Sequence, residues 1–229
     1  MKPALVVIAK APVAGRSKTR LTPPCTPAQA AALAEAALAD TLHAVAETPA
    51  PRRVVVVEGE PGAWLPGGFE VIAQRGGGLD DRLANAFADV GGPALLIGMD
   101  TPQVTPALLE FAAAALQADG MGAALGLARD GGYWAIGLRE PDAALFAGVP
   151  MSEPTTGAAQ RARLDAAGLR VATLPELRDV DTIADARAVA ALAPESRFAQ
   201  ALAAVSAAGP PRTAPAARSA AGPRRTPAG

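Results

Sequence analysis

Apolar and polar positions alternate along this chain in two rhythms, one typical of strands and one typical of helices. Short apolar runs predict strands at 4–9, 53–57, 69–73, 94–98, 123–128, 133–138 and 169–174. Capping signals and helical periodicity predict helices at about 26–47, 79–90 and 105–118, from about 142, up to 167, and at 183–192 and 198–205. Strands that alternate with helices in this way indicate an α/β domain with a parallel sheet covered on both faces.

Length and composition indicate a single folded domain followed by a tail. The 229 residues are half hydrophobic, which is enough to bury a full core. The sequence from Ser206 onward is rich in proline, alanine, glycine and arginine and has no acidic residue. Such a composition cannot bury a core, so we expect one domain over residues 1–205 and a disordered tail over 206–229.

The charge and the rare residues exclude several classes of protein. The formal net charge is −1 and the tail holds four arginines, so residues 1–205 carry a formal charge of −5. We therefore expect no nucleic-acid partner, because such binding needs a basic stripe. His43 and Cys25 are the only histidine and the only cysteine, which argues against a histidine zinc site, a Ser-His-Asp triad or an internal disulfide. No apolar run reaches the roughly 20 residues of a membrane span, so we expect a cytoplasmic protein with no membrane partner.

The loop after the first strand is the first candidate site. It concentrates cations and contains two of the three lysines of the chain. Lysine presents a compact charge to phosphate oxygens, and glycine allows a close backbone approach. The candidate phosphate-binding residues are Lys10, Gly15, Arg16, Lys18 and Arg20. The alternative is a solvated basic loop, and in both cases we expect Lys18 to be exposed.

Carboxylates that follow apolar runs form the second candidate. Asp100 stands where the run Ala94–Gly98 stops, and Pro102 prevents the strand from continuing. A carboxylate in this place can hold magnesium together with phosphate oxygens and water, or can cap the turn before the next helix. Asp179 and Asp181 precede the helix at 183–192, and from the residues alone a capping role is favoured for both.

A glycine pair followed by two aromatic residues is the third candidate. Asp130-Gly131-Gly132 separates two predicted strands and is typical of a hairpin turn. Tyr133 and Trp134 follow it directly in a chain that has one tyrosine and two tryptophans. These rings can form the wall of a substrate pocket or fill the core.

Taken together, the motifs resemble one bacterial family. They are Ala9-Lys10-Ala11-Pro12 with Gly15 and Lys18-Thr19-Arg20-Leu21, then Gly98-Met99-Asp100-Thr101-Pro102, Asp130-Gly131-Gly132-Tyr133-Trp134 and Asp179-Val180-Asp181-Thr182. This order is similar to that of GT-A-like glycosyltransferases of the arsenosugar-biosynthesis-associated type. The family is related to 2-phospho-L-lactate guanylyltransferases and to molybdenum-cofactor nucleotidyltransferases. The resemblance covers about residues 4–192.

The resemblance implies a three-layer αβα nucleotide-diphospho-sugar transferase (GT-A) fold with a mixed, mostly parallel sheet. It implies that the loop cations hold the phosphates, with Lys18 and Asp100 catalytic. Magnesium or manganese would be bound by Asp100 and Asp181, with Asp179 as the alternative second ligand, and residues 130–134 would line the site of the other substrate. The segment Met151–Thr156 departs from the tryptophan-serine-threonine pattern of the family, so the identity of the acceptor is not inherited.

Two reactions are compatible with such a site. A glycosyltransferase would move a sugar from a nucleotide-sugar to a small-molecule acceptor. A nucleotidyltransferase would join a nucleotide to a phosphorylated small molecule and release pyrophosphate. We expect the first, with the second as its alternative, and a non-catalytic nucleotide-binding protein as the alternative from another class.

Overall fold

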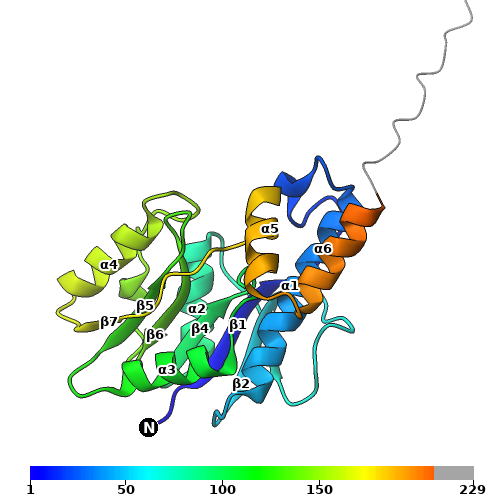
Figure 1. Ribbon diagram of the computed structural model, residues 1–229. Coiled ribbons are helices and arrows are strands. Elements are labelled where there is room, and N and C mark those ends of the chain that lie inside the picture. Colours follow the sequence, from blue (N-terminus) through cyan, green and yellow to red (C-terminus); the bar gives the residue numbers. More distant parts are fainter. Residues whose placement is uncertain (209–229) are drawn as a thin grey trace, which may run out of the picture.

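The computed structural model describes residues 1–208 of the chain. A seven-stranded sheet in the order β3-β2-β1-β4-β6-β5-β7 forms its centre (Figure 1). The strands are β1 Ala4–Lys10, β2 Arg53–Glu58, β3 Glu70–Ala73, β4 Ala94–Gly98, β5 Ala123–Leu127, β6 Tyr133–Leu138 and β7 Val171–Thr173. Only β6 runs antiparallel to its neighbours β4 and β5 among these strands, so the sheet is mixed and mostly parallel, as predicted.

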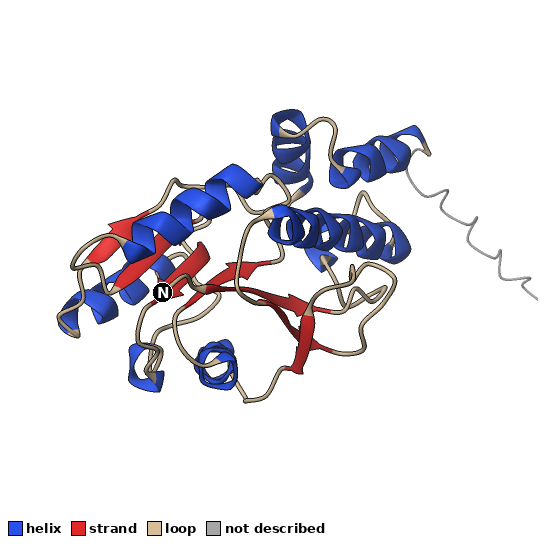
Figure 2. Cartoon of the chain, turned by 90° about the horizontal axis from the view of Figure 1, so that it is seen from below, coloured by secondary structure: helices blue, strands red, loops and turns tan. Residues whose placement is uncertain are grey.

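Helices cover both faces of the sheet, which gives the three layers expected of the fold (Figure 2). They are α1 Pro27–Glu47, α2 Leu79–Val90, α3 Pro106–Gln117, α4 Thr156–Ala166, α5 Ile183–Leu192 and α6 Arg197–Ala207. One core packs α1 and α3 against side chains such as Val7 and Leu95. The other packs α2 and α4 against the opposite face, where Phe87 stacks on Phe146 with ring centroids 5.5 Å apart.

A third apolar cluster joins the end of the described chain to its beginning. Side chains of α5 and α6, including Phe198, pack with α1 and with Leu21 of the 3-10 turn η1 (Thr19–Leu21). Asp40 of α1 accepts hydrogen bonds from the backbone N–H groups of Arg197 and Phe198, at 3.1 and 2.8 Å. These contacts hold the loop after β1 close to the segment before α5.

The helix starts follow the predicted capping chemistry. Thr26 and Gln29 form a capping box with Pro27 at the first helical position, and Thr105 caps α3 in front of Pro106. At α5 the cap is Thr182, which forms a capping box with Asp185. Asp181 is therefore not needed as the cap of this helix.

The strand expected at 169–174 is confined to Val171–Thr173, and two helical predictions also differ from the structure. The helix expected from about Asp142 is only the 3-10 turn η2 (Ala143–Leu145), because Asp142 caps it at Ala144 and the chain turns at Gly148 before Pro150. Helix α6 extends to Ala207, two residues beyond the expected end of the domain. The rest of the predicted disordered tail, 209–229, lies outside the described residues. Within residues 1–208, no helix is long and apolar enough to cross a membrane.

Candidate functional site

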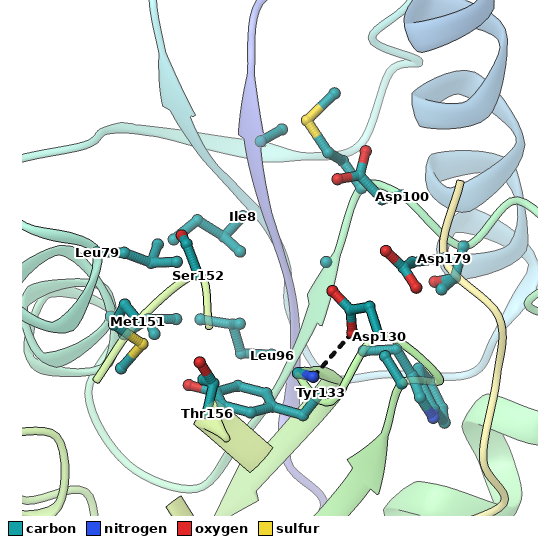
Figure 3. Close-up of a pocket in the computed structure, with 18 of the residues that line it drawn as sticks. Ile8, Leu79, Leu96, Asp100, Asp130, Tyr133, Met151, Ser152, Thr156 and Asp179 are labelled. Carbon is teal, nitrogen blue, oxygen red and sulfur yellow. Dashed lines mark hydrogen bonds between the residues drawn. The ribbon is translucent and has the colours of Figure 1, made fainter. Parts of the chain in front are cut away.

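A cavity of about 340 Å³ opens at the carboxyl ends of β1 and β4. This position follows from topology, since parallel strands deliver the loops that follow them to the same edge of a sheet. The first of its two sides is an acidic rim, which we define as Asp100, Asp130 and Asp179. The other is an apolar compartment, which we define as Leu79, Leu83, Leu96, Tyr133 and Met151. Figure 3 shows the three rim carboxylates grouped apart from Leu79, Leu96 and Met151.

Lys18 and Asp100, predicted from separate motifs, are in direct contact. The Nζ of Lys18 lies 2.7 Å from Oδ1 of Asp100 and also donates a hydrogen bond to the carbonyl oxygen of Val180. Its side chain is only 12% exposed, so the expectation of an exposed loop lysine is wrong. Lys18 itself adopts a left-handed conformation (φ 49°), which turns the backbone at the start of η1. Cation and carboxylate thus meet at the cavity mouth.

Asp179 reaches the acidic rim because its segment lies beside the ends of β4 and β5. Leu177 pairs with Ala128, and the N–H of Val180 donates to the carbonyl oxygen of Asp100 at 2.9 Å. Burial raises the pKa of Asp179 to about 6, and the nearby carboxylate of Asp130 adds to the effect. A raised pKa means that negative charge on this carboxyl group is not fully compensated by the surrounding protein.

The other predicted cations lie around the cavity rather than in the acidic rim. Arg20 forms an ion pair with Asp181 at 2.5 Å, and this carboxylate is not among the cavity-lining residues. Lys10 lines the cavity and pairs with Glu58 at 3.2 Å. Arg16 is exposed at the loop tip, next to Gly15, whose φ of 79° is in the left-handed region. The structure therefore brings Lys18, Asp100, Asp130 and Asp179 together, and leaves Asp181 at the edge with Arg20.

The predicted hairpin turn at 130–132 has a second, tertiary role. Gly132 donates its N–H to Asp130 Oδ1 at 2.8 Å, and this bond fixes the carboxylate (Figure 3). Gly131 has a φ of 92°, and a Cβ built on it would lie 1.9 Å from the carbonyl oxygen of Pro154. The N–H of Gly157 donates to the carbonyl oxygen of Gly131 at 2.7 Å. The glycine pair thus allows the turn to touch the start of α4 backbone to backbone.

The two aromatic residues after the turn differ in their environment. Trp134 belongs to the core, with 2% of its surface exposed, and its Nε1 donates to the carbonyl oxygen of Pro175 at 2.9 Å. Tyr133 faces the apolar compartment and its hydroxyl donates to Gln160 at 3.4 Å. Burial raises the pKa of Tyr133 above its ordinary value. Both rings line the cavity, and Tyr133 is the more exposed of the two.

Sequence reasoning assigned no role to several lining residues. Leu79 and Leu83 belong to α2 and Leu96 to β4, where apolar residues are expected from periodicity alone, and Leu79 is 40% exposed at the cavity. Met151 and Ser152 belong to the segment that departs from the family pattern, and Ser152 has a φ of 61°, which is uncommon for a residue with a side chain. That departure was the available signal that this segment faces the cavity.

Comparison with known proteins identifies the family. The model of a family described as uncharacterized protein conserved in bacteria (DUF2064) matches residues 30–153. The chain belongs to the DUF2064 family. No curated protein sequence matches it significantly.

Solved structures support the fold assignment of this DUF2064 protein. A putative nucleotide-diphospho-sugar transferase from Desulfovibrio desulfuricans is 27% identical, with a TM-score of 0.73 over 88% of this chain and 99% of the other. CMP:2-keto-3-deoxy-manno-octonic acid synthetase, in complex with CTP, is 16% identical (TM-score 0.56; 84% and 99% covered). A 2-C-methyl-D-erythritol 4-phosphate cytidylyltransferase from Thermus thermophilus is 18% identical (TM-score 0.53; 85% and 100% covered). The expected nucleotide-diphospho-sugar transferase fold is confirmed, and these proteins belong to the enzyme class, transferase, that the sequence predicted.

The acidic rim fits a divalent metal that is held only in part by protein. Among the described residues, no group of three or more histidine, cysteine, aspartate or glutamate side chains is arranged to hold an ion by itself. Magnesium commonly takes one or two carboxylates and completes its shell with phosphate oxygens and water. Asp100 and Asp179 supply two such carboxylates on one cavity. The buried hydroxyl of Thr101, also on the cavity, has no hydrogen-bond partner.

Proposed function

We propose that this DUF2064 protein is a metal-dependent glycosyltransferase that moves a sugar from a nucleotide-sugar to a small-molecule acceptor. The observation that carries this proposal is the 2.7 Å contact between Lys18 and Asp100 at the mouth of the cavity. This contact joins a lysine that is suited to bind phosphate and a carboxylate that is suited to bind a divalent metal. Both lie at the carboxyl edge of the sheet, where ligands bind in α/β folds. The fold shared with a putative nucleotide-diphospho-sugar transferase agrees with it.

In this proposal each group at the site has one task. Lys18, Arg20 and Arg16 would neutralise the diphosphate, and Asp100 with Asp179 would hold magnesium or manganese. Asp179 is favoured over Asp181, the ligand implied by resemblance, because Asp179 lines the cavity whereas Asp181 pairs with Arg20. When bound, the metal stabilises negative charge on the leaving diphosphate. Asp130, exposed and held by Gly132, is placed to accept a proton from the acceptor.

The transfer is balanced as follows. The acceptor oxygen forms a bond to the anomeric carbon of the sugar, and the bond from that carbon to the β-phosphate oxygen breaks with its electron pair. The nucleoside diphosphate leaves with that pair, and the acceptor proton passes to Asp130 or to solvent. Fixed cations that face the developing charge stabilise it without reorganisation.

Nucleotidyl transfer is the second candidate, and the length of the cationic loop favours it. Lys10, Arg16 and Lys18 spread charge over a stretch that suits an extended triphosphate. In that reaction a phosphate oxygen of the acceptor attacks the α-phosphorus of a nucleoside triphosphate and pyrophosphate leaves. Two of the structural relatives are a synthetase in complex with CTP and a cytidylyltransferase.

A thermal-shift screen of nucleoside triphosphates and nucleotide-sugars, with and without magnesium, tests the proposal. A ligand at 100 times its dissociation constant stabilises the folded protein by about 2.7 kcal/mol. We expect one nucleotide-sugar to raise the melting temperature only when magnesium is present, and product analysis by mass spectrometry to detect transfer of its sugar. If no nucleotide stabilises the protein, the proposed function is wrong. If a triphosphate alone is turned over, the second candidate replaces the first.

Aspartate-to-asparagine variants separate the proposed metal ligands. Asp100→Asn and Asp179→Asn are expected to abolish the magnesium-dependent part of the shift, because each removes a charged ligand with little change of shape. Asp181→Asn is the matched control and is expected to retain that part. The opposite result would be loss of the magnesium-dependent shift in Asp181→Asn and its retention in Asp179→Asn. That result would support Asp100 and Asp181, the ligands implied by the resemblance.

A further inference from the structure

The charge of the cavity is distributed unevenly. Five charged residues line it: Lys10 and the four carboxylate residues Asp100, Asp130, Glu153 and Asp179. Lys10 is the one lysine or arginine of residues 1–208 among the lining residues, and it belongs to the β1 side, where it pairs with Glu58. The turn before β6 and the segment before α4 therefore each present a carboxylate to the cavity, Asp130 and Glu153, but no lysine or arginine.

Two of the polar side chains next to the apolar compartment, those of Thr156 and Tyr133, are already bonded within the protein. Thr156 Oγ1 accepts from the N–H of Glu153 at 3.1 Å and donates to the carbonyl oxygen of Pro150 at 2.8 Å. The hydroxyl of Tyr133 is directed to Gln160, whose Nε2 donates to the carbonyl oxygen of Leu145. What these residues present to the cavity is mainly carbon surface, continuous with Leu79, Leu96 and Met151.

The start of α4 faces this cavity, and a helix N-terminus often binds anions through its free N–H groups. Here those groups are occupied. The N–H of Thr156 donates to Glu153, that of Gly157 donates to Gly131 and that of Ala159 donates to Thr155. Only Ala158 of the first four residues has no such backbone bond among those recorded for the described chain. The helix start thus supports the turn at 130–132 rather than forming an anion site.

We infer that the apolar compartment binds the body of the acceptor and that this acceptor is an uncharged, hydroxyl-bearing molecule rather than a phosphate ester. This inference rests on the proposed function, which assigns the nucleotide donor to the acidic rim and the loop after β1. A phosphate monoester carries up to two negative charges at neutral pH and would meet the carboxylates of Asp130 and Glu153, where no lysine or arginine of residues 1–208 lines the cavity. An alcohol with a compact apolar body gains from burial against Leu79, Tyr133 and Met151 and avoids that repulsion.

The inference also discriminates between the two transfers. Nucleotidyl transfer to a phosphorylated molecule requires a phosphate group on the acceptor, whereas glycosyl transfer requires only a hydroxyl group. An acceptor site without cations therefore selects the hydroxyl acceptor of glycosyl transfer. The same argument does not exclude the nucleotide diphosphate, because the proposed function assigns its charge to the cations of the loop after β1 and to the metal.

The test compares benzyl alcohol with benzyl phosphate, two probes that share one apolar body. Binding to the full chain is measured by saturation-transfer NMR in EDTA, and again with the nucleotide and magnesium that give the largest thermal shift. We expect the alcohol to bind with a dissociation constant at least tenfold lower than that of the ester in both states. Tighter binding of the ester, or binding of neither probe, would overturn the inference.

A variant that introduces a positive charge tests whether the two probes bind in the apolar compartment. Met151→Arg places a cation in the apolar compartment and is expected to reverse the preference, so that benzyl phosphate binds more tightly than benzyl alcohol. Val71→Arg on β3 is the matched control, because Val71 is 48% exposed and does not line the cavity. Both variants are checked for unchanged nucleotide-induced thermal shifts. An unchanged preference in Met151→Arg would show that the probes bind elsewhere and would contradict the inference. Failure of every nucleotide to shift the melting temperature would instead refute the proposed function while the EDTA measurement still judges the acceptor site.

Discussion

The acidic rim and the apolar compartment lie in one cavity, yet they are held in place by different means. The rim depends on polar contacts between distant segments, such as the bond from Lys18 to the carbonyl oxygen of Val180, 162 positions away. The apolar compartment depends on close packing of α2, β4 and the segment before α4, and this segment is held where Gly131 of the 130–132 turn touches Pro154. Polar and ionic contacts hold the acidic rim in place, whereas packing holds the apolar compartment. We therefore expect most substitutions to affect mainly one of the two sides.

Under the proposed function, this difference would give the two sides different parts in the reaction. Fixed charges suit a ligand whose own charge changes during transfer. Carbon surface provides affinity that does not depend on charge. A site that combines both can hold a charged donor and an uncharged acceptor side by side. The following substitutions test that separation.

The largest effect is expected from Gly131→Ala, which alters the packed side. The new Cβ would lie 1.9 Å from Pro154 O on a residue with a φ of 92°. We expect the free energy of unfolding to fall by about 3 kcal/mol or more, because left-handed strain and the clash add. Urea denaturation measures the loss.

Gly15→Ala is the control for this variant. Gly15 also has a positive φ, 79°, but nothing lies within 4 Å of the position of its Cβ. Strain alone should cost about 1 kcal/mol. Equal losses of stability in the two variants would show that backbone strain accounts for the whole effect and that the clash with Pro154 contributes nothing.

Lys18→Met tests the charged side. The substitution leaves the carbonyl oxygen of Val180 and the carboxylate of Asp100 without their cation, which should cost about 1–2 kcal/mol of stability. It should also weaken binding of the stabilising nucleotide by about 10- to 100-fold, the loss of one charge-assisted hydrogen bond.

Lys10→Met is the comparison for Lys18→Met. The side chain of Lys10 is 65% exposed and its pair with Glu58 is solvated, so the expected stability change is below about 1 kcal/mol. Calorimetric titration and thermal melting measure both variants. Equal losses of stability and of nucleotide affinity in the two variants would show that the burial of Lys18 gives it no special role.

Asp179→Asn is expected to stabilise the metal-free protein at high pH. The pKa of Asp179 rises from 3.8 to about 6 on folding, so its ionisation above about pH 6 opposes the folded state. Solvent screening reduces the effect, and we expect a gain of about 1 kcal/mol at pH 8. The gain should fade as pH falls through about 6 and vanish below about 4, where the carboxyl group is protonated in both states.

Melting in EDTA across this pH range measures the effect. Asp181→Asn serves as the control, since Asp181 is paired with Arg20 and its removal should give no such gain. A pH-independent gain in Asp179→Asn would mean that its source is not the titration of this carboxyl group.

The smallest effect on stability is expected from Leu79→Ala. Leu79 is 40% exposed, so the free energy of unfolding should change by less than about 1 kcal/mol, well below a buried leucine deletion. Binding of benzyl alcohol should weaken by several-fold, because part of the apolar compartment is removed. A large loss of stability without a change in probe binding would identify Leu79 as a packing residue only.

Much of the architecture could be predicted from local patterns. The strand at 94–98 and the helix starts at Thr26 and Thr105 follow from apolar runs and capping residues, which act over a few neighbouring positions. The helix expected at 142 failed because one cap at Asp142 is followed too soon by Gly148 and Pro150 for a helix to extend. Motif order also led to the correct fold, which the solved structures confirm.

Sequence patterns were enough to predict the α/β class, to place Asp100 and Asp130 directly after predicted strands and to place Lys18 in the loop that follows the first strand. They could not decide that Lys18 is buried against Asp100, or that Asp179 rather than Asp181 lines the cavity. Those relations depend on how the segment before α5 lies against the ends of β4 and β5, through the bond from Val180 to Asp100. Local patterns report propensities of neighbours in sequence, whereas burial and contact between distant segments arise only when the whole sheet is assembled.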